Sequence, residues 1–187
     1  MNLNELRDKA YNTACEHGFH DKKLSNEHCL MLVITELSEA VKADRKGLYM
    51  TEEDKKEYLF CQKEKFYMYA YDNYIKGSVD EEIADACIRL LDLAGLRNID
   101  FGDWDNGWED IVNDILPDAV TKYTFTEEMF AACRNITDQL DSIEDVVCSS
   151  IGVLRVICYV HNIDLEWHIE QKMIYNSLRE KMHGKKY

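Results

Sequence analysis

The chain has 187 residues, of which 46% are hydrophobic and 31% are charged, so it is long enough for one folded domain with a sizeable core. Its formal net charge of −14 argues against binding a nucleic acid polymer, because phosphate contacts require an excess of Lys and Arg. One proline and eight glycines leave few helix breakers, which favours long helices. We therefore expect a single domain over residues 1–187.

Cysteine usage and hydropathy indicate the compartment. The seven cysteines are an odd number without Cys-x-x-Cys spacing, which predicts reduced core thiols rather than disulfides or zinc ligands. The first residues are polar, and the longest apolar run, VVCSSIGVLRVICYV, is too short to cross a bilayer. We therefore expect a cytoplasmic protein that does not contact a membrane.

Apolar residues recur with a period of about 3.6 along the chain, and no convincing strand alternation is present. Capping signals, in which an acidic residue follows a Ser or Thr by three positions, start four segments, at Thr51, Ser78, Thr124 and Ser142. The predicted helices span residues 3–16, 26–46, 52–76, 79–97, 106–122, 126–140, 143–161 and 165–182. This pattern predicts an all-α helical bundle of about eight helices.

The predicted helix 26–46 carries two acidic residues in an apolar sequence. Glu36 and Glu39 are three residues apart, so they lie on one face of the helix. Buried carboxylates are costly unless something pairs with them. Either a cation such as Lys42 or Arg45 neutralises these glutamates, or they hold a metal ion.

The predicted helix 79–97 repeats this spacing with Glu82 and Asp85, and Arg89 and Asp92 extend the same stripe. Two acid pairs on neighbouring helices could surround Mg²⁺, which prefers oxygen ligands and is often completed by substrate phosphates. Bound Mg²⁺ could polarise a phosphoryl group and activate a water molecule. The alternative is a solvated face with an internal ion pair.

Two segments of the chain are similar to each other. The residues that follow Ser78 and Ser142 align without a gap at an offset of 64, and both segments end in Asn-Ile-Asp. Either a helix-pair unit is duplicated in degenerate form, or two amphipathic helices with similar caps look alike. In both cases the acid pair Glu82 and Asp85 occurs in the first segment alone, so any chemistry of these carboxylates belongs to that segment.

The predicted helix 165–182 has a basic polar face. Lys172, Asn176 and Arg179 fall on one stripe, which His183 continues. This face suits a polyphosphate, because Arg forks onto phosphate oxygens and Lys supplies a point charge. The alternative is an ordinary basic surface helix with an apolar back.

Together, these three motifs resemble the all-α NTP pyrophosphohydrolase superfamily, which includes MazG-like proteins and dimeric dUTPases. The family's Glu-x-x-Glu motif matches TELSEA, its Glu-x-x-Asp motif matches EEIADACIRLLDLAG, and its Lys-x-x-x-Asn-x-x-Arg motif matches KMIYNSLR. The resemblance implies a four-helix core, a homodimer or higher oligomer, and hydrolysis of an NTP or dNTP to the monophosphate and pyrophosphate.

The resemblance also implies roles for individual residues. Four carboxylates would bind Mg²⁺, or Mn²⁺ in its place, and take part in catalysis: Glu36, Glu39, Glu82 and Asp85. A water molecule, deprotonated with help from one of the glutamates, would attack the α-phosphorus. Lys172, Asn176 and Arg179 would bind the substrate, and we also expect Arg89, on the acidic stripe, to bind it.

The chain departs from the family in the 42 residues between Glu39 and Glu82. The insert 48–77 is rich in tyrosine, and it could cover the pocket, stack on a base, form an oligomer contact or pack on the bundle. His17, Phe19 and His20 in the loop HGFHDKKL are candidate base or phosphate contacts or structural residues. A second hypothesis is a non-catalytic nucleotide-binding or regulatory protein on the same scaffold.

Overall fold

The computed structural model describes residues 2–63, 65–102, 123–137 and 142–180. Within these ranges the chain forms eight α-helices and no strand, which confirms the predicted all-α bundle. The predicted helix 106–122, the end of the predicted helix 126–140 and His183 lie outside the described residues. The helices are α1 (Leu3–Glu16), α2 (Asn26–Asp44), α3 (Glu52–Lys63), α4 (Tyr67–Tyr74), α5 (Val79–Arg97), α7 (Phe125–Thr137), α8 (Ile143–Val160) and α9 (Leu165–Ser177).

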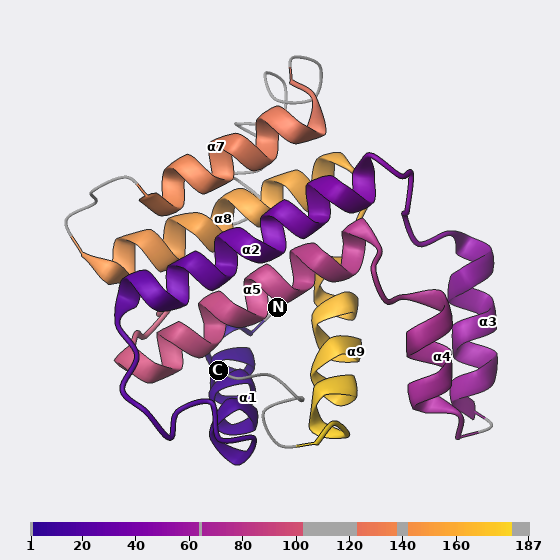
Figure 1. Cartoon of the computed structure of the whole chain (residues 1–187), viewed down its shortest axis with the longest axis horizontal. Helices are drawn as coiled ribbons and strands as arrows, with labels where there is room; N and C mark the ends of the chain where they lie inside the picture. Colours follow the sequence, from indigo (N-terminus) through magenta and orange to yellow (C-terminus); the bar gives the residue numbers. More distant parts are fainter. Residues whose placement is uncertain (1, 64, 103–122, 138–141, 181–187) are drawn as a thin grey trace.

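Four helices form a closed ring around the main core. Helix α2 packs on α5, α5 on α8, α8 on α7, and α7 packs back on α2 (Figure 1). Leu37, Leu90 and Leu154 are fully buried between them, and full burial of one such side chain contributes about 1.5–3 kcal/mol. Helices α1 and α9 both pack on α5, which makes α5 the central helix of the molecule.

The predicted capping signals form at all four positions. In each case the backbone N–H three residues later donates to the Ser or Thr hydroxyl at 3.1–3.3 Å; the caps are Thr51, Ser78, Thr124 and Ser142. Helices α5 and α8 also end alike, with Asn98 and Asn162 in the left-handed region at φ 54° and 56°. Because such caps follow from local sequence, the duplication of a helix pair stays a prediction.

The predicted helix 52–76 is wrong as a single element, because the chain breaks into α3 and α4. Lys65 adopts a φ of 65°, and the Phe66 N–H closes on the Cys61 carbonyl at 3.1 Å. The break lets α4 fold back along α3, so that both helices bury aromatic residues in one cluster with Tyr175 of α9. A single straight helix would present only one narrow stripe to α9.

The predicted helix 165–182 is also too long, because α9 ends at Ser177 with Leu178 as its C-cap. Ile174 and Leu178, on the apolar back of the helix, are 43% and 55% exposed, so within the described residues little burial supports a further turn. Beyond the helix, the Glu180 carbonyl approaches the His17 ring at 3.3 Å.

Close packing of α1 on α5 depends on Gly95. A Cβ atom at this position would lie 2.4 Å from the Cβ of Tyr11, which no two such atoms can tolerate. The glycine therefore allows α1 to approach α5 and form one wall of the site described below.

Among the described residues, no single helix is long and apolar enough to cross a membrane, whereas the bent pair α8 and α9 passes that test together, at an angle of 112°.

Candidate functional site

The two acidic helices lie side by side despite the 42 residues between their motifs. Those residues leave the bundle as α3 and α4 and return at Ser78, so that α2 and α5 can pack along their length (Figure 1). Carboxylate oxygens of Glu36, Glu82 and Asp85 consequently lie within 4.8 Å of one another. Three carboxylates at this separation suit a divalent cation with oxygen ligands.

A cavity of about 530 Å³ opens beside this cluster. Helices α1, α2, α5 and α9 and the loop after α1 contribute to its walls. Seven of the eight predicted site residues line it: Glu36, Glu39, Asp85, Arg89, Lys172, Asn176 and Arg179. Glu82 belongs to the carboxylate cluster without lining the cavity, whereas Glu39 lines the cavity from an exposed position outside the cluster.

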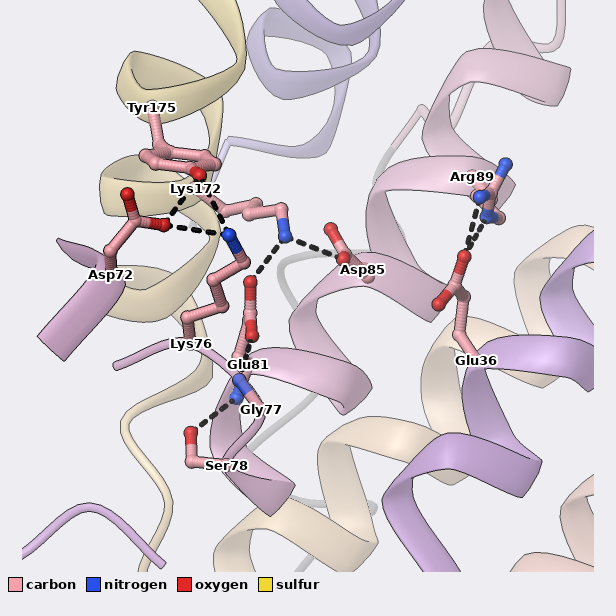
Figure 2. Close-up of polar contacts among 10 residues, drawn as sticks. All are labelled: Glu36, Asp72, Lys76, Gly77, Ser78, Glu81, Asp85, Arg89, Lys172 and Tyr175. Carbon is pink, nitrogen blue, oxygen red and sulfur yellow. Dashed lines mark hydrogen bonds and ion pairs between the residues drawn. The ribbon is translucent and has the colours of Figure 1, made fainter. Parts of the chain in front are cut away.

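Glu36 is buried and pairs with a cation from the neighbouring helix. Its carboxylate accepts from Arg89, whose Nε and Nη2 both lie 2.5 Å from Oε1 (Figure 2). The partner is therefore on α5, rather than Lys42 or Arg45 on its own helix. Burial raises the pKa of Glu36 and the negative charge of Asp85 adds to this, while Arg89 opposes the shift.

Lys172 extends from α9 between two carboxylates of α5 (Figure 2). Its Nζ lies 2.7 Å from Asp85 Oδ2 and donates to Glu81, which also accepts the Gly77 N–H. Burial alone would lower the pKa of Lys172, but Asp85 and Glu81 more than offset this and raise it. The lysine is therefore a charged residue held at the edge of the acidic cluster.

Sequence reasoning assigned Glu81 to helix capping and missed this second role. Its N–H does bind the Ser78 hydroxyl, as the capping signal predicts. The residue, however, is 3% exposed, and its carboxylate binds Lys172, 91 residues away. The available signal was the i, i+4 spacing of Glu81 and Asp85, which places both on one face of α5.

The negative charge of Glu82 is disfavoured in the folded protein. Burial is the largest cause, and together with the surrounding carboxylates of Glu81, Asp85, Glu39 and Glu36 it raises the pKa of Glu82 to about 8. A bound cation would relieve this repulsion, because an opposite charge nearby favours the ionised carboxylate. The donor set therefore fits a hard divalent cation on both chemistry and spacing.

Asn176 and Arg179 lie on the cavity side of α9 and just beyond its end. Oδ1 of Asn176 is buried and has no hydrogen-bond partner among the described residues. The Arg179 guanidinium lies over the Tyr175 ring, with Cζ 5.6 Å from the ring centroid. An unsatisfied amide oxygen costs free energy, so this atom is suited to contact a ligand.

The insert packs on a different face of α9. Gln171 Oε1 accepts hydrogen bonds from the hydroxyls of Tyr58 and Tyr67 at 3.1 and 3.0 Å. Tyr71 stacks on Tyr175 with ring centroids 4.1 Å apart, and the Tyr175 hydroxyl donates to Asp72 (Figure 2). Among the described residues that line the cavity, none comes from 48–77, so the insert supports α9 from behind rather than covering the pocket.

A second polar pair lines the cavity near α1. His20 Nε2 lies 2.7 Å from Asp92 Oδ1, and the His20 ring is 5.2 Å from that of Tyr11. Burial raises the pKa of Asp92, and the contact with His20 opposes the shift. The loop histidine thus reaches the acidic stripe of α5 in the folded chain.

Comparisons of the chain with family models, with curated proteins and with solved structures found no match. The resemblance to the all-α pyrophosphohydrolases consequently rests on the sequence motifs alone.

Proposed function

We propose that the protein is a Mg²⁺-dependent nucleoside triphosphate pyrophosphohydrolase, which cleaves an NTP or dNTP to the monophosphate and pyrophosphate. One observation carries the proposal: carboxylates from α2 and α5 and the polar face of α9 meet at a single cavity. Phosphoryl transfer depends mainly on positioning and charge stabilisation. It therefore requires acidic side chains that hold a divalent metal ion and basic side chains that bind phosphate oxygens.

Glu36, Glu82 and Asp85 would hold Mg²⁺, which supplies charge for the phosphate oxygens and acidifies a water molecule. Before the ligands arrive, Arg89 and Lys172 neutralise two of these carboxylates. With Mg²⁺ at these carboxylates, both side chains would be free to contact the phosphates. The protein's own cations would thus exchange partners, and Glu36 and Asp85 would lie beside a positive charge in both states.

The substrate would be hydrolysed by attack of water on the α-phosphorus. The new bond joins the water oxygen to the α-phosphorus, the bond from that phosphorus to the bridging oxygen breaks, and pyrophosphate leaves. One glutamate of the site takes the proton from the water. Arg179 and Lys172 stabilise the charge on the phosphates, and Asn176 orients them through its side-chain amide.

The test is release of pyrophosphate from a panel of NTPs and dNTPs with Mg²⁺ or Mn²⁺. Glu82→Gln is the informative variant, because Glu82 has a disfavoured charge, so its neutralisation should leave the fold intact. We expect at least a hundredfold loss of kcat in this variant and none in Glu53→Gln, an exposed position on α3. Absence of pyrophosphate with every nucleotide, or full activity of Glu82→Gln, would refute the proposal.

The pairing of Lys172 and Arg89 with the acidic cluster also favours a second candidate, a nucleotide-binding protein without catalysis. In that case the two ion pairs are permanent, and they complete the site without a metal ion. This candidate predicts that a nucleotide raises the melting temperature equally with Mg²⁺ and with EDTA, and that no pyrophosphate is released.

A further inference from the structure

We infer that the end of the cavity at His20 is a base-binding subsite, where Nδ1 of His20 accepts a hydrogen bond from an N–H group of a nucleobase. This inference deepens the proposed function and rests on it for the position of the phosphates.

The subsite lies at a suitable distance from the acidic cluster. Asp85, Arg89 and Asp92 follow one another along the cavity side of α5. The seven residues from Asp85 to Asp92 correspond to about 10 Å along the helix axis at 1.5 Å per residue. A nucleotide whose phosphates lie at Asp85 would therefore extend its base toward Asp92 and His20.

The wall near His20 has the composition of a base pocket. Apart from His20 itself, α1 and the loop after it contribute Ala10, Thr13, Ala14, Phe19 and Leu24 to the cavity lining. These side chains are small, apolar or aromatic, and none carries a positive charge. They suit a flat heterocycle better than a phosphate, because ligand sites combine apolar walls with few polar groups.

His20 provides the polar group. Its side chain is 9% exposed, and Nδ1 is buried without a hydrogen-bond partner in the part of the chain that the structure describes. Nε2 lies 2.7 Å from the Asp92 carboxylate, which accepts the Nε2–H and so assigns the tautomer in which Nδ1 carries a lone pair.

The unsatisfied acceptor defines the chemistry of its ligand. A buried acceptor without a partner destabilises the empty site, and a ligand N–H directed at Nδ1 would remove that cost. Nucleobases offer such donors as ring N–H or amino groups. A hydroxyl of the sugar is the other donor on a nucleotide, so the experiment must separate the base from the sugar.

The experiment compares nucleoside triphosphates with ribose 5-triphosphate, which has the sugar and the phosphates but no base. His20→Phe keeps a ring and removes the acceptor, and Asp92→Asn keeps the volume and removes the charge that selects the tautomer. His161→Phe is the matched control, because His161 forms the same kind of pair, with Glu128 at 2.6 Å, outside the cavity lining. Melting temperatures verify the fold of each variant.

We expect His20→Phe and Asp92→Asn to raise KM for the preferred nucleotide about tenfold more than they raise KM for ribose 5-triphosphate. The value of kcat should change little. Methylation of the donor nitrogen of the base should cost a similar factor with the wild-type protein and nothing with His20→Phe. His161→Phe should behave as wild type. Equal losses on both ligands, or no loss on either, overturn the inference.

Binding calorimetry keeps this result distinct from failure of the proposed function. If no nucleotide is hydrolysed, the same ligands are titrated into the wild-type protein and the variants with Mg²⁺ present. A tenfold weaker Kd of His20→Phe for the nucleotide alone supports the subsite without catalysis. Equal affinity of the wild-type protein for the nucleotide and for ribose 5-triphosphate, or no binding of either, overturns it.

Discussion

Replacement of Lys172 by Met tests whether one buried ammonium group stabilises the acidic side of α5. Lys172 is 6% exposed and Glu81 is 3% exposed, while the side chain of Asp85 is 20% exposed. The Met side chain fills a similar volume but leaves two carboxylates without their cation. Removal of one partner from a buried ion pair costs about 3–5 kcal/mol, so we expect a loss of this size in the free energy of unfolding at pH 8.

The loss should depend on pH with a definite sign. Burial already raises the pKa of Glu81 in the folded protein, and Lys172 opposes that shift, so the variant raises it further. A carboxyl whose folded pKa lies above its unfolded value contributes stability at low pH that is lost as the pH rises through the folded pKa. The deficit of Lys172→Met should therefore be smaller at pH 5 than at pH 8.

Urea denaturation at both pH values measures the effect, with Lys46→Met as the control at an exposed position. The double variant Glu81→Gln/Lys172→Met removes a positive and a negative charge together and should recover at least half of the loss. The reasoning is refuted if Lys172→Met lies within 1 kcal/mol of the wild type at pH 8. A double variant no more stable than the single variant would refute it as well.

Three further predictions concern packing and the metal site. Gly95→Ala should destabilise the protein by about 1–3 kcal/mol, because the new Cβ meets Tyr11 at 2.4 Å; a raised melting temperature, as helix propensity alone predicts, would contradict this. Gln171→Leu leaves the Tyr58 hydroxyl without its acceptor and leaves Tyr67 only the backbone carbonyl of residue 171 at 3.4 Å, so it should speed hydrogen exchange in α3 and α4 well before the bundle opens. Uniform exchange would exclude a local role. Arg89→Gln removes the guanidinium that pairs with Glu36, so Mg²⁺ should raise the melting temperature of the variant more than that of the wild type. Pyrophosphate release should fall. An unchanged effect of Mg²⁺ on the melting temperature would argue against metal binding at Glu36.

Interactions between residues close in sequence account for most of the secondary structure. Hydroxyl caps such as Ser78 and Ser142 act within three residues, and the left-handed asparagines act within one turn, so they can be recognised without knowledge of the fold. The acid pairs are equally local, because positions i and i+3 share a helix face wherever that helix packs. For this reason the all-α class and the acidic and basic faces of the site helices could be predicted.

Where local signals compete with packing, the prediction was wrong. The periodicity of 52–76 continues through the region where the chain turns back at Lys65, and only the aromatic cluster with Tyr175 explains why two short helices form. The end of α9 is the second case, where Leu178 completes an apolar stripe that stays exposed among the described residues. Burial of aromatic side chains decided the first boundary, and the lack of burial decided the second.

Local sequence was thus sufficient for helix type, caps and the spacing of acidic and basic residues, because each of these depends on neighbours within a turn or two. Tertiary packing decided which charges meet: Arg89 with Glu36 across 53 residues, Lys172 with Glu81 across 91, and His20 with Asp92 across 72. The physical reason is that electrostatic pairing and burial depend on distance in space. In this chain those distances are determined only when α1, α2 and α9 pack around α5.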